Sequence, residues 1–113
     1  MQLAQSIIRR SGISPSSSAI AIRVAVALYG AGAIDTSRAL TTYGELVGAR
    51  IVVREGLPPR RMHYTVARLV ARLELHRLGA WTDAREHRTA AEIVIPQTRF
   101  EAELARDGLE IGR

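Results

Sequence analysis

No cysteine occurs among the 113 residues, which excludes disulfide bonds and thiolate metal sites. Lysine is also absent, so all sixteen basic side chains are arginines and lysine acetylation cannot regulate the chain. Aromatic residues make up only 4% of the sequence, although apolar residues as a whole make up 47%. We therefore expect one domain over residues 1–113, with a core built mainly from Ala, Val, Leu and Ile.

Long apolar runs are missing as well. The longest candidate, residues 19–30, is interrupted by Arg23 and is shorter than the roughly 20 residues that a membrane helix needs. No charged stretch precedes an apolar one at the N-terminus, so no signal peptide is expected. These absences predict a cytoplasmic protein without a membrane association.

The net charge of +5 is distributed unevenly along the chain. Residues 54–77 carry six arginines against two glutamates, whereas residues 78–113 carry five arginines against seven acidic residues. A basic segment of this kind is typical of nucleic-acid binding. The acidic C-terminal third offers another interpretation, in which it covers the basic segment of the same chain.

Apolar spacing and turn residues predict a mostly helical α+β fold with a small sheet of two or three strands. The helix that follows Pro15 is apolar on nearly all sides and is expected to be deeply buried, with the serines of residues 16–18 capping its start. Residues 51–53 form the best strand, and a weaker one is expected around residues 38–41. The predicted helices cover residues 1–10, 15–29, 60–78, 83–95 and 97–106.

The segment 49–78 has the layout of a zinc-peptidase core: a strand, a Gly-Pro-Pro turn and a long helix. Thr65-Val66-Ala67 leads into the five positions where such a helix carries His-Glu-x-x-His. The end of the next helix in such domains has a second motif, which resembles Ala90-Ala91-Glu92-Ile93-Val94-Ile95-Pro96 followed by Phe100. Over roughly residues 15–105 the chain resembles the ImmA/IrrE family of metallopeptidase domains, which accompany repressors in bacteria, phages and mobile elements. The resemblance implies a minimal zincin-like fold.

The departures from that family fall on the catalytic positions. The five positions of the metal motif read Arg68-Leu69-Val70-Ala71-Arg72, and an arginine cannot ligate a metal because it does not lose its proton. The resemblance places the third ligand at or beside Arg85, with Asp83 and Glu86 nearby. We therefore expect a pseudo-peptidase that holds neither metal nor cofactor.

Arg61, Arg68, Arg72 and His76 lie on one face of the predicted helix at spacings of seven and four residues. Two interpretations of Arg68 and Arg72 are open. One is an internal ion pair with Glu86, Asp83 or Glu92 on the neighbouring helix, and the other is an exposed site for an anion or an acidic partner. A metal site rebuilt from His63, His76 and His87 is disfavoured, because their spacing does not suit chelation.

A catalytically inactive relative could retain the backbone route by which zincins hold peptides. The strand Ile51, Val52 and Val53 is the candidate edge for such strand addition. The sequence therefore predicts a non-catalytic, regulatory protein- or peptide-binding domain, with a repressor- or toxin-type partner. The alternative is a nucleic-acid-binding protein that uses the Arg-rich helix 60–78, and an unrelated enzyme activity ranks third.

Overall fold

The computed structural model describes residues 2–95 and has a mostly helical α+β fold, as predicted. A helix that begins at residue 83 runs to residue 95, the last described residue. The predicted helix 97–106 lies outside the described residues. The other helices are α1 (Leu3–Ser11), α2 (Ile20–Tyr29) and α3 (Pro59–Arg77), and the strands are β1 (Ile34–Ser37), β2 (Gly44–Val47) and β3 (Arg50–Arg54).

The three strands form one mixed sheet in the order β1-β3-β2. β1 pairs with β3 in parallel, with Ile34 opposite Ile51, and β2 pairs with β3 antiparallel, with Leu46 opposite the same Ile51. The prediction that Ile51, Val52 and Val53 form an exposed edge strand is therefore wrong. β3 is the most apolar strand, so it lies at the centre, where its two neighbours complete its hydrogen bonds.

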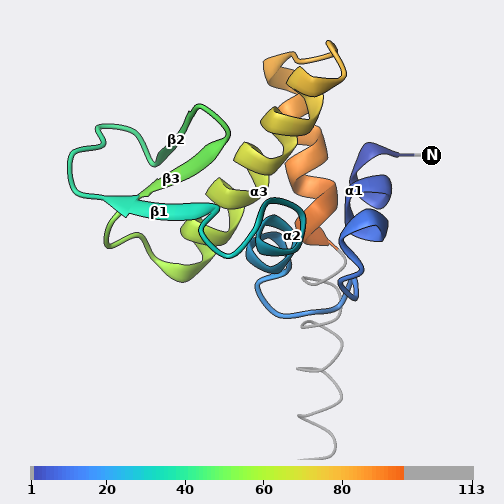
Figure 1. Cartoon of the computed structure of the whole chain (residues 1–113), viewed down its shortest axis with the longest axis horizontal. Coiled ribbons are helices and arrows are strands. Elements are labelled where there is room, and N and C mark those ends of the chain that lie inside the picture. The colour runs from blue at the N-terminus through green and yellow to red at the C-terminus, as the bar shows by residue number, and fades with distance from the viewer. Residues whose placement is uncertain (1, 96–113) are drawn as a thin grey trace, which may run out of the picture.

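α3 is the centre of the fold, with the sheet on one side and α1 and the helix 83–95 on the other (Figure 1). Ile51 and Val53 point from β3 into the core beside α3, whereas Val52 is half-buried on the other face of the sheet. α2 packs across α3 and α1, but it is buried along one face rather than all round, and its Val26 is exposed. A helix at the surface of a small domain has room for one buried stripe only.

The start of α2 differs from the prediction that serines cap it. Its N-cap is Ala19, which adopts a left-handed conformation and makes no side-chain cap hydrogen bond. The N–H of Ala21 donates instead to Nε2 of His63, 3.0 Å away on α3. A side chain from another helix thus accepts a free N–H at the start of α2, where the neighbouring serines were expected to do so. In contrast, the helix 83–95 has a local cap, because the hydroxyl of Thr82 accepts the N–H of Arg85 at 3.1 Å.

The sheet also differs from the prediction in its outer strands. β1 begins four residues before the weak strand expected at 38–41, because Ile34 pairs with the central Ile51. β2 was not predicted, since it is short and begins with a glycine. A Cβ on Gly44 would lie 2.6 Å from Cγ2 of Thr65 and 3.0 Å from Cδ1 of Leu69, so the absence of a side chain lets β2 approach α3 closely.

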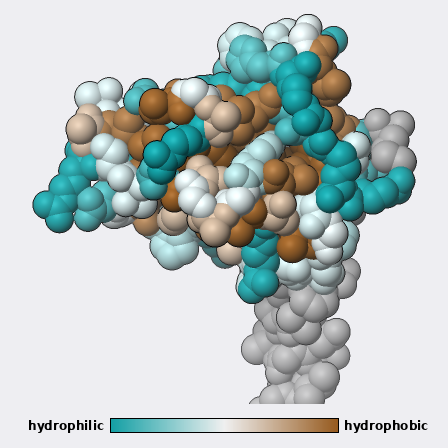
Figure 2. Space-filling view, in the orientation of Figure 1, coloured by the Kyte–Doolittle hydropathy of each residue, from teal (hydrophilic) through white to brown (hydrophobic). Residues whose placement is uncertain are grey.

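Hydrophobic and hydrophilic residues are interleaved over the sheet and the helices on the surface shown in Figure 2. Within residues 2–95, no helix has both the length and the apolar character needed to cross a membrane.

Candidate functional site

The site is built around Arg68 and Arg72, which lie one turn apart on the face of α3 that meets the helix 83–95. The connection between the two helices is short, and Gly79 with a φ of 67° reverses the chain there. This turn brings Glu86, in the first turns of the second helix, against both guanidinium groups. The Glu86 carboxylate is fully buried, with 0% of its surface exposed.

Within the described part of the chain, five contacts surround the Glu86 carboxylate. Arg68 donates from Nε at 3.1 Å and places Nη2 3.0 Å away, both at Oε2. Arg72 donates from Nε to Oε1 at 2.5 Å and from Nη2 to Oε2 at 3.0 Å, which is the two-pronged geometry that guanidinium and carboxylate groups favour. Trp81 donates its indole N–H to Oε1 at 2.8 Å. These donors use the lone pairs that the carboxylate offers.

Electrostatics keep the Glu86 carboxylate ionised. Burial on its own would raise the pKa of Glu86, but the hydrogen bonds from Arg72 and Trp81, the charge of Arg72 and the hydrogen bond from Arg68 outweigh it and hold that pKa below its usual range. The hydrogen bond to Glu86 likewise raises the pKa of Arg72 against the opposing effect of burial. Of the two open interpretations of Arg68 and Arg72, the internal pair with Glu86 is therefore confirmed.

The other predicted site residues lie apart from this network or at its rim. His76 is exposed and stacks on Trp81, with ring centroids 5.1 Å apart. Arg61 lies roughly 10 Å away along α3, two turns before Arg68, and its guanidinium carbon is 4.5 Å from the ring centroid of Tyr43. The structure thus brings together Arg68 and Arg72, leaves His76 at the edge and separates Arg61.

Leu69 occupies the position where the resemblance would place a general base. It is 1% exposed and belongs to the core, close enough to Gly44 that a Cβ there would meet it. No group of three or more His, Cys, Asp or Glu side chains within residues 2–95 is arranged to hold a metal ion. Asp83, which lies near the position that the resemblance gives to the third ligand, is exposed, and its Oδ2 is 3.7 Å from Nε2 of His87.

A second buried carboxylate, Glu74, lies on α3 one turn after Val70. It accepts a hydrogen bond from the hydroxyl of Tyr29 on α2 at 2.6 Å. Arg10 of α1 forms an ion pair with it, and Nη2 of Arg77 lies 3.1 Å from Oε1. This carboxylate therefore ties three helices together.

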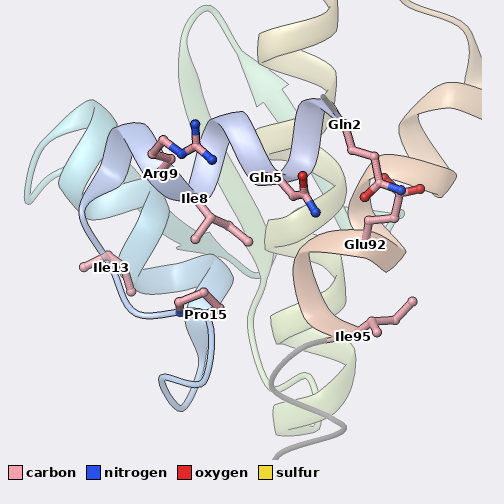
Figure 3. A pocket seen from close by; sticks show the side chains of 8 residues that line it. All are labelled: Gln2, Gln5, Ile8, Arg9, Ile13, Pro15, Glu92 and Ile95. Carbon is pink, nitrogen blue, oxygen red and sulfur yellow. The ribbon is translucent and has the colours of Figure 1, made fainter.

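A hollow lies between α1 and the helix 83–95 (Figure 3). The side chains of Gln2 and Glu92 point toward each other across it, and Ile95 lies on its rim. Its wall contains apolar side chains and polar or charged ones in similar numbers, so the lining does not favour one class of ligand. The remaining lining residues are Gln5, Ile8, Arg9, Ile13 and Pro15.

No family model matches the chain, and neither the curated proteins nor the solved structures include a significant match to it.

Sequence reasoning named Arg68, Arg72 and Glu86 but missed the aromatic donor and the second carboxylate. Trp81 is the only tryptophan and lies five residues before Glu86, which was a usable signal for an indole N–H donor near that carboxylate. Glu74 gave a weaker signal: it is an acidic residue within the apolar stripe of a basic helix. Its partner Tyr29 comes from α2, and no local pattern connects the two.

Proposed function

We propose that this chain is a non-catalytic, regulatory domain of the cytoplasm that binds an extended protein segment and is derived from a metallopeptidase-like fold. The observation that carries the proposal is the network of Arg68, Glu86 and Arg72. By the resemblance, the two arginines stand at the positions of two histidine ligands, and Glu86 lies beside the position of the third. A guanidinium supplies only donors, so the network fills this place with an ion pair that has no capacity to ligate zinc.

The burial of Leu69 supports the same proposal. A general base must reach a water molecule or substrate, whereas this position faces Gly44 within the core. The side chains at the three catalytic positions thus contribute to packing and charge pairing between elements. A repressor- or toxin-type partner is the class that the family resemblance implies.

The proposed binding surface is the free edge of β2, in place of the central β3. The N–H of Arg54 donates to the carbonyl of Tyr43 at 2.7 Å, which fixes the alternation of the β2–β3 ladder. With Gly44 opposite Val53, the backbone groups of Gly44 and Leu46 point away from β3. Within the described residues no strand pairs with that side, so it has the form that strand addition requires.

Among the described residues, one side-chain contact lies on this edge. The exposed hydroxyl of Thr42 is 3.4 Å from the carbonyl oxygen of Gly44, which is at the long limit for a hydrogen bond between two oxygens. A backbone N–H of an added strand would make a shorter bond to the same oxygen. The Thr42 contact is therefore compatible with strand addition.

A histidine replacement tests the derivation from a metallopeptidase. We expect Arg68→His/Arg72→His to bind one zinc ion per chain, because Glu86 is then free to act as the third ligand. The matched control adds Glu86→Gln and is expected to lose zinc, while circular dichroism checks that each variant is folded. Stoichiometric zinc in the wild-type chain, or cleavage of a peptide by it, contradicts the proposal.

Amide hydrogen exchange tests the binding surface. A short uncharged peptide of alternating threonine and valine is expected to protect the amides of Gly44 and Leu46 when it is added to the full chain. The amide of Glu45, which points toward β3, is the internal control and is expected to change little. Absence of protection at both amides, at any peptide concentration that remains soluble, counts against the edge of β2 as the surface.

A further inference from the structure

Two exposed arginines lie at one end of β2. Arg54 is opposite Tyr43 in the sheet, and Arg61 lies over the ring of Tyr43. Neither arginine forms an ion pair with a carboxylate of residues 2–95.

The N-terminus of α3, where Arg61 lies, adds to the positive charge. The first turn of α3 contains no acidic residue, and the positive end of the helix dipole lies there. Like charges held close together favour the approach of an anion, and a guanidinium binds a carboxylate through two parallel hydrogen bonds. The exposed ring of Tyr43 holds the Arg61 guanidinium beside the end of β2.

We propose that the segment that pairs with β2 belongs to a partner protein and carries acidic side chains at the end that lies beside Tyr43. This inference rests on the proposed function and names the chemistry of its partner. Strand pairing supplies affinity that does not depend on sequence, and Arg54 and Arg61 select the acidic end. The partner is thus an extended acidic segment.

Two other occupants fit this surface less well. If β2 paired with β2 of a second copy, the pairing would add a second set of unpaired arginines and would bring no acidic end to neutralise the first set. A nucleic acid would satisfy the arginines, but it does not offer the alternating N–H and C=O groups that the edge of a sheet needs. An acidic peptide satisfies both requirements.

Binding of three peptides to the full chain tests the inference. The probes are the uncharged threonine–valine peptide, the same peptide with glutamates at one end, and the same peptide with lysines at that end. We expect the acidic peptide to bind about tenfold more tightly than the uncharged one, the size of one charge-assisted hydrogen bond. The lysine peptide is expected to bind most weakly, and added salt is expected to narrow these differences.

Paired substitutions locate the effect. Arg54→Gln/Arg61→Gln is expected to abolish the preference for the acidic peptide while the uncharged peptide still binds. The matched control is Arg9→Gln/Arg88→Gln, which removes the same charge from exposed positions on α1 and the helix 83–95 and is expected to keep the preference. Equal losses in the two variants would show a general charge effect and overturn the inference.

The remaining outcomes separate this inference from the proposed function. If the uncharged and acidic peptides bind equally and protect Gly44 and Leu46, the acidic preference is wrong while edge binding stands. If no peptide binds, both are wrong. Protection of these amides that grows with protein concentration alone would identify a second copy as the occupant. Duplex DNA that displaces the acidic peptide would identify nucleic acid as the ligand. Either result overturns the inference.

Discussion

Two buried carboxylates, Glu86 and Glu74, have similar partners in different surroundings. Each is bound by two arginines and by one aromatic donor. At Glu86 the arginine side chains are 27% and 24% exposed, whereas at Glu74 they are 39% and 63% exposed. The arginines of the Glu86 site therefore have little contact with water besides their carboxylate, whereas those of the Glu74 site are more exposed to water.

The difference shows that the cost of removing a buried carboxylate depends on whether its arginine partners can be hydrated instead. An arginine that can turn to solvent loses little when its carboxylate is removed, but a mostly buried one is left without a counterion. The Glu86 site also joins two consecutive helices, while the Glu74 site joins α1, α2 and α3. We therefore expect the first site to dominate local stability and the second to hold α1 in place.

Neutralising Glu86 tests this comparison most strongly. Glu86→Gln is expected to lower the free energy of unfolding by about 3 kcal/mol, because Arg68 and Arg72 lose their shared counterion in a largely buried position. Urea denaturation at neutral pH measures the change. A loss well below that of the matching substitution at Glu74 would reverse the proposed ranking.

Neutralising Glu74 is expected to have a smaller effect. Glu74→Gln should lower the free energy of unfolding by about 1.5 kcal/mol, because the Tyr29 hydroxyl can still donate to the amide oxygen and both arginines can hydrate. The same denaturation experiment applies, and exchange of the α1 amides reports whether that helix loosens first. Equal stability losses at Glu86 and Glu74 would show that arginine exposure does not distinguish the sites.

Acid titration isolates the Glu86 site. The pKa of Glu86 is lowered in the folded protein. The ionised carboxylate therefore makes its full contribution to the free energy of unfolding above the ordinary carboxyl pKa of about 4.3, and this contribution is lost as the pH falls through the lowered pKa. The stability difference between wild type and Glu86→Gln is expected to shrink below about pH 4. A difference that stays constant through the acid range would contradict the ion pair.

Alkaline titration isolates the Glu74 site. Burial, followed by the hydrogen bond to Glu74 and its charge, raises the pKa of Tyr29 against the opposing charges of Arg10 and Arg77. The contribution of the protonated phenol is therefore present below about pH 10 and is lost as the pH rises through the raised pKa. We expect Tyr29→Phe to flatten the decline of stability above that pH, which denaturation across the alkaline range would measure.

The smallest expected effect concerns the most exposed arginine of the two sites. Arg77→Ala should change the free energy of unfolding by less than about 0.5 kcal/mol, the usual size for a charge pair within one helix turn, because Arg77 is mostly exposed while Arg10 and Tyr29 still hold Glu74. Thermal denaturation in low and high salt measures it. A larger loss would show that Arg77 is needed to compensate Glu74 despite its exposure.

Much of the helical framework could be predicted from the sequence. The long helix, its glycine ending at Gly79 and the cap at Thr82 follow from apolar spacing and from local turn chemistry. The pairing of Arg68 and Arg72 with an acid on the next helix was also within reach, because like charges one turn apart need compensation. β2 was missed, since a four-residue strand that begins with Gly44 has little local signal.

Order within the sheet and the contents of the buried sites depended on contacts between distant segments. The sequence alone determined the α+β class, the position of the basic helix and the absence of histidine at the two arginine positions. Only the tertiary structure decided that β3 is central, that His63 caps α2 and that Glu74 meets Tyr29 and Arg10. Helix periodicity and turn chemistry act between neighbours along the chain, whereas strand order and charge pairing are set by which surfaces meet when the core closes.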